Sequence, residues 1–246
     1  MPIIFGLNPV LEALESGQPI DKIYLLAAKQ NSAVSKIYKE ARQQNIPLTR
    51  ASRKKLEQIT GGGKHQGIAA LISPVHYAAL SNLVEDIQRT GQMPLLAVLD
   101  RIQDPHNMGA IIRSAEVLGI HGIIFSLQDS VPVTDVVVKA SAGAVFHQRL
   151  CKVERLPAAI RYLKESGLWI YSADAAGSNS LWEMDFAKPT AVIIGSEGSG
   201  IRPGLKKESD GIFHIPQSGK TESLNASVAA GIIFHEMHRQ RSSAGR

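Results

Sequence analysis

Three short stretches of this 246-residue chain combine residue types that could bind a substrate and stabilise charge on it. They are DPHNMGAIIRSAEVLG with Asn107 and Arg113, IIGSEGSGIR with Glu197, and IPQSGKTESLNASVAAG with Ser223 and Asn225. Amide side chains orient polar ligands through hydrogen bonds, a carboxylate accepts hydrogen bonds, and a guanidinium stays protonated. Together these groups could hold a polar ligand and stabilise an anion that forms on it.

Each stretch also has a purely structural interpretation. Arg113 could be a surface arginine paired with a carboxylate, Glu197 could close a glycine turn, and Ser223 could only cap a helix. The glycine-rich stretch lacks the G-K-[ST] of a P-loop and the G-x-G-x-x-G of a dinucleotide site, and no G-x-S-x-G motif occurs. His235 and His238 are three residues apart rather than four, so we do not expect a zinc site.

The elements that must position these residues are buried strands. The runs PLLAVLD, GIIFSL, LWIYSA and TAVIIG are strongly apolar and are separated by helical patterns, which is typical of a parallel sheet covered on both faces. Ligands of such sheets bind at the carboxyl ends of the strands. Asn107 is a candidate N-cap of the helix that carries Arg113, and Ser223 or Thr221 is a candidate N-cap of the last helix. Free N–H groups at that helix end would attract polar or anionic ligand groups.

The N-terminal segment has a different charge balance. Residues 1–72 carry ten Lys and Arg against five Asp and Glu, whereas residues 73–246 carry 17 of each sign. The segment alternates helix and strand, with Asn8 and Ser32 as expected N-caps, and it contains the basic helix SRKKLEQIT and the turn GGGKHQG. A basic module suggests binding to a polyanion, although such charges can also merely solubilise a helix. The candidates for phosphate contact are Arg53, Lys54, Lys55 and Lys64.

These patterns predict a compact α/β domain over residues 1–73, a linker with one helix over 74–92, and a larger α/β domain over 93–246. The hydrophobic content of 44% and the mean hydropathy of −0.03 allow a sizeable core. No apolar run approaches the roughly 20 residues of a membrane span, and the first residues lack the features of a secretory signal, so we expect a cytoplasmic protein. The single cysteine, Cys151, excludes an intramolecular disulfide and is interpreted as a small core residue.

Taken in order, the three stretches resemble the signature motifs of the SpoU branch of the SPOUT methyltransferases, the TrmH family. These enzymes methylate ribose 2′-hydroxyl groups of RNA with S-adenosylmethionine. The stretches FGLNPVLEAL and KHQGIAA resemble the ribosomal-protein L30-like substrate-binding domain of the subgroup that modifies a guanosine of 23S rRNA.

The resemblance implies an α/β SPOUT domain with a C-terminal trefoil knot, an exception to the rule that chains do not thread loops. It also implies a homodimer with the site at the interface and a reaction that requires no metal. The catalytic residues that it implies are Asn107, Arg113, Glu197, Ser223 and Asn225. The positions that it implies for contact with S-adenosylmethionine are Gly195, Ser196, Ile215, Gln217 and Leu224.

The expected function is therefore 2′-O-methylation of a guanosine ribose in 23S rRNA. Because a guanidinium is a poor base, we hypothesise that Arg113 binds the adjacent phosphate and stabilises the developing alkoxide, while a phosphate oxygen or water takes the proton. Two alternatives stay open. One is a tRNA ribose methyltransferase, which the L30-like module disfavours, and the other is a catalytically silent RNA-binding ribosome-assembly factor with the same fold.

Overall fold

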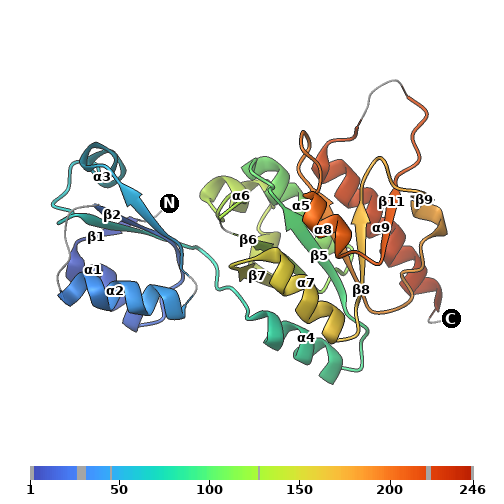
Figure 1. The fold of residues 1–246 in the computed structure, drawn as a ribbon, viewed down its shortest axis with the longest axis horizontal. Coiled ribbons are helices and arrows are strands. Elements are labelled where there is room, and N and C mark those ends of the chain that lie inside the picture. The colour runs from blue at the N-terminus through green and yellow to red at the C-terminus, as the bar shows by residue number, and fades with distance from the viewer. Residues whose placement is uncertain (1–2, 27–31, 45, 127, 220–222, 245–246) are drawn as a thin grey trace. The chain divides into compact units, whose positions relative to one another are not determined.

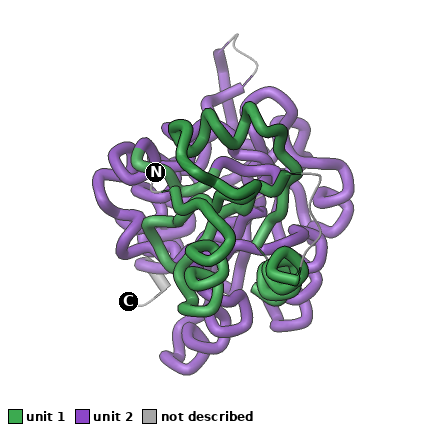
Figure 2. The backbone as a smooth tube through the Cα atoms, turned by 90° about the vertical axis from the view of Figure 1, so that its left-hand side faces the viewer, with its two compact units in different colours: residues 1–76, 132–135 green, residues 77–131, 136–246 purple. Residues whose placement is uncertain are grey.

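The computed structural model divides the chain into two compact units, residues 1–76 with 132–135 and residues 77–131 with 136–246 (Figure 2). It describes all residues except 1–2, 27–31, 45, 127, 220–222 and 245–246. No helix in the described ranges has the length and apolarity that a membrane span requires.

The first unit is a four-stranded sheet with helices on both faces (Figure 1). Its strands are β1 (Ile3–Phe5), β2 (Ile20–Leu26), β3 (Leu48–Ala51) and β4 (Ile68–Ile72), in the order β1-β4-β2-β3, and its helices are α1 (Leu7–Glu15), α2 (Ser32–Gln43) and α3 (Arg53–Thr60). Alternate residues of β2 face opposite sides: Ile23 and Leu25 pack with α1 and α2, whereas Tyr24 and Leu26 pack around Leu56 of α3.

The predicted N-cap of the first helix is wrong. Helix α1 begins at Leu7, one residue before Asn8, and its N-cap position is Gly6 with φ of 98°. Because β1 ends at Phe5, the chain must turn at once into the helix, and glycine adopts that positive φ at little cost. The exposed N–H group of Leu7 donates to Gln66 Oε1 instead of to a cap side chain.

The second unit contains a seven-stranded sheet in which every pairing is parallel, with the order β7-β6-β5-β10-β8-β11-β9. The strands are β5 (Leu95–Asp100), β6 (Gly122–Ser126), β7 (Leu150–Val153), β8 (Trp169–Ala173), β9 (Asn179–Ser180), β10 (Thr190–Gly195) and β11 (Gly211–His214). The chain runs outward from β5 to β6 and β7 and then forms β8 and the edge strand β9 on the other side. It returns to β10 beside β5 and next forms β11 between β8 and β9, so the strands that follow β5 and β10 lie on opposite sides. The boundary between β5 and β10 is therefore a switch point, where open α/β sheets bind ligands.

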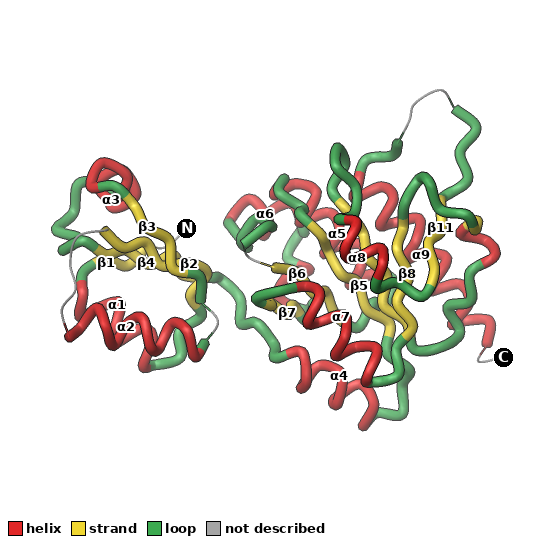
Figure 3. The backbone as a smooth tube through the Cα atoms, in the orientation of Figure 1, coloured by secondary structure: helices red, strands yellow, loops and turns green. Residues whose placement is uncertain are grey.

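Helices cover both faces of this sheet, as predicted (Figure 3). Helices α4 (Leu80–Arg89), α7 (Leu156–Glu165) and α8 (Pro203–Lys207) bury apolar residues against one face. Helices α5 (Pro105–Val117) and α9 (Ala226–Ala244) pack against each other on the opposite face, and short helical segments occupy α6 (Asp135–Ala140), η1 (Ala144–Phe146) and η2 (Leu181–Glu183). The expected α/β architecture is thus confirmed, whereas the trefoil knot stays a prediction.

Helix α4 falls inside the range 74–92 that was expected to be a linker. Its residues Leu83, Val84 and Ile87 are buried in the core of the second unit. Cys151 lies in the same core, where burial raises the pKa of its thiol to about 12, so the prediction of a core cysteine is confirmed. The second unit therefore begins at Tyr77, before the helix rather than after it.

Hydrogen bonds connect the C-terminal end of α9 to the loops that precede the central strands β5 and β10. Arg241 donates from Nε to the Phe186 carbonyl and from Nη2 to the Lys188 carbonyl, both at 2.6 Å. It also donates to the carbonyls of Met93 and Pro94, at 3.1 and 3.3 Å. One guanidinium thus connects α9 with the chain entering β5 and β10.

We predict that Arg241→Ala lowers the free energy of unfolding by about 2–4 kcal/mol, because several carbonyl acceptors lose a charged donor. Arg241→Lys should recover only part of this loss, since an ammonium group lacks the planar fork that reaches several carbonyls. Urea unfolding measures both. Arg89→Ala, which breaks exposed ion pairs with Glu85 and Asp86 on α4, is the control and should change stability much less. Equal losses for Arg241→Ala and Arg89→Ala would contradict the anchoring role.

Candidate active site

Two adjacent hollows open at the carboxyl ends of β5, β8 and β10. The first has a volume of about 220 Å³ and the second of about 510 Å³. They share Ser196, Glu197 and Ala226 as lining residues. Two binding spaces therefore meet at the loop after β10 and the start of α9.

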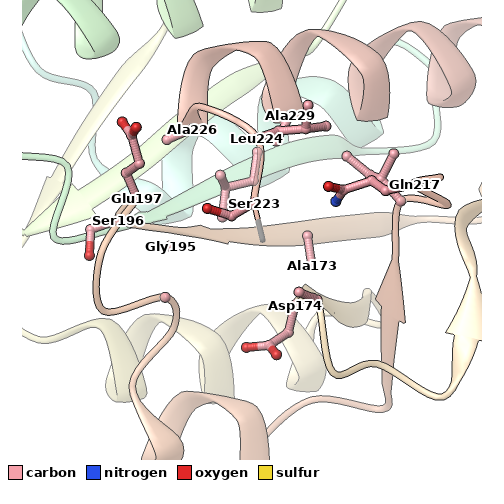
Figure 4. A pocket seen from close by; sticks show the side chains of 14 residues that line it. Ala173, Asp174, Gly195, Ser196, Glu197, Gln217, Ser223, Leu224, Ala226 and Ala229 are labelled. Atoms are coloured by element: carbon pink, nitrogen blue, oxygen red, sulfur yellow. The ribbon is translucent and has the colours of Figure 1, made fainter. Parts of the chain in front are cut away.

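All five residues predicted to contact a cofactor line the first hollow (Figure 4). They are Gly195, Ser196, Ile215, Gln217 and Leu224. Figure 4 shows Leu224 and Ser223 near the end of β10 at Gly195, with Glu197 and Gln217 at opposite sides of the space. Gly195 must be glycine because a Cβ atom there would overlap the carbonyl group of Gly200, where the following loop closes back on the strand.

Sequence reasoning missed Asp174, which also lines this hollow. It lies directly after the apolar strand β8, and that position at the carboxyl edge was the signal that could have identified it. Lys206 Nζ is 2.6 Å from Asp174 Oδ2, and the Ala176 N–H also donates to this carboxylate. Burial acts to raise the pKa of Asp174, but these two donors outweigh it and the pKa is lowered. The group is therefore an ion-paired carboxylate at the wall of the hollow.

A cluster of three side chains lies where the hollows meet. Asn225 Nδ2 donates to Asn107 Oδ1 and to Glu197 Oε2, each at 3.0 Å. Asn107 comes from α5, Glu197 from the loop after β10, and Asn225 from the residue before α9. The structure thus brings three of the five predicted catalytic residues into direct contact. In the sequence, Asn107 lies 118 residues and Glu197 28 residues before Asn225.

The same asparagine caps α9. Its Oδ1 accepts from the N–H and hydroxyl groups of Ser227, at 2.9 and 2.6 Å, and its carbonyl accepts from the Ala229 N–H. The prediction that Ser223 caps this helix is therefore wrong. The alternative candidate, Thr221, lies outside the described residues. Ser223 instead lines the first hollow and makes no hydrogen bond within the described part of the chain.

Asn107 is not an N-cap either, which corrects a second prediction. The N-cap of α5 is Asp104, whose Oδ1 accepts from the His106 N–H at 2.9 Å, and Pro105 occupies the first helical position. Proline prefers that position because its missing N–H group would be unpaired there anyway. Asn107 consequently lies in the first turn, and its side-chain oxygen is free to accept from Asn225.

Arg113 is not brought to this cluster within the chain. It is exposed on α5, lines neither hollow, and has no hydrogen-bond or ion-pair partner among the described residues. Val117, one turn further along α5, is 69% exposed, and Val228 and Ile232 of α9 are 50% and 37% exposed. The helix pair α5–α9 therefore exposes both an arginine and several apolar side chains.

The predicted RNA-binding residues lie on α3 and in the loop after it, in the first unit. Arg53, Lys54 and Lys55 form the first turn of α3, and Lys64 follows in the connection to β4; all four are exposed. The first turn contains no acidic residue. Positive charge at a helix N-terminus opposes the helix dipole. Glu57 lies 3.5 Å from Arg53 and offsets its charge, whereas Lys54 and Lys55 make no ion pair among the described residues.

Comparison with known proteins gives matches over both units. The SpoU rRNA Methylase family matches residues 94–235, and the RNA 2′-O ribose methyltransferase substrate-binding family matches residues 3–78. YacO of Bacillus subtilis (strain 168), assigned to the TrmH family of tRNA/rRNA methyltransferases, is 35% identical over 98% of this chain and 97% of its own. A Staphylococcus haemolyticus protein with the same assignment is also 35% identical, over 99% of this chain and 97% of its own.

Solved structures support the same relationship. An AdoMet-bound rRNA methyltransferase from Sinorhizobium meliloti is 26% identical with a TM-score of 0.59, over 96% of this chain and 86% of that one. A TrmH/SpoU tRNA modifying enzyme from A. aeolicus is 26% identical with a TM-score of 0.56, over 68% of this chain and 86% of that one. The predicted family and enzyme class, RNA methyltransferase, are confirmed. The chain belongs to the SpoU rRNA methylase family.

Proposed function

We propose that this protein transfers a methyl group from S-adenosylmethionine to the ribose 2′-hydroxyl of a guanosine in 23S rRNA. The observation that carries the proposal is the hydrogen-bonded cluster of Asn107, Glu197 and Asn225 between two adjoining hollows. A group transfer needs two reactants held in line, and two spaces that meet at one polar cluster provide such an arrangement.

The first hollow suits S-adenosylmethionine. Its wall includes Ile194, Ile215, Leu224 and Ala229, which can pack against a nucleoside base, and its polar groups include the carboxylates of Asp174 and Glu197. None of its described lining residues is basic, which disfavours a phosphate-bearing cofactor and favours a ligand that carries a positive charge. When bound, S-adenosylmethionine supplies an electrophilic methyl group. The similar rRNA methyltransferase from Sinorhizobium meliloti is named as AdoMet-bound, which supports the choice of S-adenosylmethionine as the cofactor of this protein.

The second hollow is where we place the target ribose. Asn107 lines it, and Glu197 and Ser196 lie on its border with the first hollow. Asn107 is uncharged and accepts from Asn225 through Oδ1, so its Nδ2 group can orient a ribose without taking the hydroxyl proton. Glu197 accepts from Asn225 and holds the loop side of the cluster in place. These residues position the hydroxyl, and a phosphate oxygen or water accepts the proton.

The first unit favours rRNA over tRNA as the substrate. The rRNA methyltransferase from Sinorhizobium meliloti aligns with 96% of this chain, whereas two tRNA-modifying structures align with 68% and 63%. The excess positive charge resides in residues 1–72, and three basic side chains crowd the first turn of α3 against the helix dipole. Phosphate groups of a folded rRNA segment would offset the unfavourable interaction between these positive charges and the helix dipole.

We further propose that the active form is a homodimer in which Arg113 serves the partner's site. Its guanidinium lies outside both hollows of its own chain, and the packed helices α5 and α9 also expose the apolar residues Val117, Val228 and Ile232. Pairing of this face with a second copy would cover those residues and carry Arg113 towards another cluster. There the guanidinium would bind the phosphate beside the target ribose and stabilise developing negative charge.

A catalytically silent assembly factor is the alternative from another class. A protein that only bound RNA would have no need for the cluster of Asn107, Glu197 and Asn225, whose members come from three separate elements. Calorimetry with S-adenosylmethionine and mapping of ribose methylation in a strain lacking the gene separate the possibilities. We expect cofactor binding and loss of one 23S rRNA methyl group. Absence of cofactor binding would favour the silent factor, and loss of a tRNA methyl group with intact rRNA would show the substrate assignment to be wrong.

Asn225 variants test the two roles of this side chain. Asn225→Ala removes the helix cap and the cluster donor, so we expect unfolding to become easier by about 1 kcal/mol and methyl transfer to fall steeply. Asn225→Asp keeps an oxygen that can cap α9 but replaces the donor with a second carboxylate beside Glu197. It should therefore keep most of the stability and lose the transfer rate. Urea unfolding and single-turnover methylation report the two effects, and full activity of Asn225→Asp would exclude a role for the donor.

Mixing of two inactive variants tests the role of Arg113 across the dimer. Arg113→Ala and Asn225→Ala should each be nearly inactive alone. In an equimolar mixture that has exchanged subunits, half of the dimers are mixed and each has one intact site, so activity should return to about a quarter of wild type. Arg113→Ala mixed with the double variant is the control and should stay inactive. No recovery in the first mixture, with dimers confirmed by ultracentrifugation, would show that Arg113 does not act across the interface.

A further inference from the structure

Arg101, the residue directly after β5, has an unusual backbone conformation. Its φ is +60°, and Gln66 and Ala142 are the other described residues besides glycine with positive φ. A side chain that starts at Cβ is disfavoured in this left-handed region, and arginine cannot make the local hydrogen bonds by which asparagine offsets the cost. Strain of this kind persists where the surrounding structure requires the resulting side-chain direction.

The guanidinium of Arg101 is directed at the loop between β10 and α8. Its Nη2 donates to the carbonyls of Ser199 and Gly200, at 3.3 and 3.2 Å, and its Nε lies 3.8 Å from Asp100 Oδ2. The side chain is 29% exposed. Arg101 thus bridges two loops that are about 100 residues apart in sequence.

That loop forms walls of both hollows. Ser196, Glu197 and Gly200 line the first hollow, and Ser196 to Ser199 line the second together with Arg101 itself. Within the loop, the Gly200 N–H donates to the Ser196 carbonyl at 2.9 Å. At its far end, the Arg202 N–H donates to the buried carboxylate of Asp100 at 2.8 Å, and the Arg202 guanidinium is 2.7 Å from the same carboxylate. Asp100 therefore holds the far end of the loop and Asn225 holds Glu197, whereas Arg101 holds the Ser199–Gly200 part.

We propose that Arg101 is a positioning residue for the methyl-transfer site. Its left-handed backbone aims the guanidinium at the Ser199 and Gly200 carbonyls, and these contacts fix the loop in the form that presents Ser196 and Glu197 to both hollows. The proposal rests on the assignment of S-adenosylmethionine to the first hollow. Arg101 acts through the loop and does not touch the methyl donor.

The Arg101→Gly variant separates this role from general stability. Arg101→Gly removes the guanidinium but relieves the backbone strain, so its thermal midpoint should be no lower than that of Arg101→Ala, which loses the guanidinium and keeps the strain. Both variants should bind S-adenosylmethionine about fivefold to thirtyfold more weakly in calorimetry, the range that one or two lost hydrogen bonds produce. Their KM for S-adenosylmethionine should rise more than their kcat falls. Arg101→Lys keeps the positive charge but lacks the planar guanidinium that reaches two carbonyls, so it should recover the affinity for S-adenosylmethionine only in part.

Ala142→Gly is the matched control, because it relieves a positive φ of 49° at a position that lines neither hollow. It should leave cofactor affinity unchanged. If the wild-type protein binds S-adenosylmethionine and Arg101→Gly binds it equally well, the positioning role is refuted while the proposed function stands. If the wild-type protein does not bind S-adenosylmethionine, the proposed function fails and this inference fails with it.

Discussion

One side-chain amide joins the three parts of the chain that form the site. Asn225 donates both of its amide hydrogens, to Asn107 and to Glu197, and its oxygen starts α9 by accepting from Ser227. Because donor and acceptor are both used, the amide has only one satisfactory orientation. The start of α9, the first turn of α5 and the loop after β10 therefore meet at a single side-chain amide, and both hollows lie next to it.

The strand order explains why these distant motifs meet. Strands β5 and β10 are direct neighbours in the sheet, with Asp100 opposite Gly195 at their carboxyl ends. The alternation of apolar strands and helices was visible in the sequence, so a parallel sheet with a site at its carboxyl edge was predictable. The adjacency of β5 and β10 was not, because 89 residues separate the end of one strand from the start of the other. The prediction that the three motifs form one site came from the family resemblance, because the periodicity of apolar residues does not show which strands are neighbours.

Local details of the helix ends were the least predictable part. The starts of α1, α5 and α9 each lie near more than one residue able to cap a helix, and the choice depends on contacts outside the segment. Asn107 and Asn225 show this most clearly. The former is released from capping because Asp104 and Pro105 begin α5, whereas the latter caps α9 and at the same time reaches across to two other elements. The strain at Arg101 was likewise invisible, since nothing in its sequence context specifies a positive φ.

Charge is divided between the two units in a way that suits a transfer reaction on RNA. The described lining of the first hollow contains no basic residue, and Lys206 beside it is paired with Asp174, so this space does not attract phosphate. Attraction for a polyanion resides instead in residues 1–72, which carry the whole net positive charge of the chain. Long-range electrostatic capture acts through phosphates and is insensitive to sequence, whereas orientation of one ribose requires short neutral hydrogen bonds. In the proposed arrangement the excess positive charge of residues 1–72 captures the RNA, and the first hollow, which has no basic residue in its described lining, is left to the cationic methyl donor.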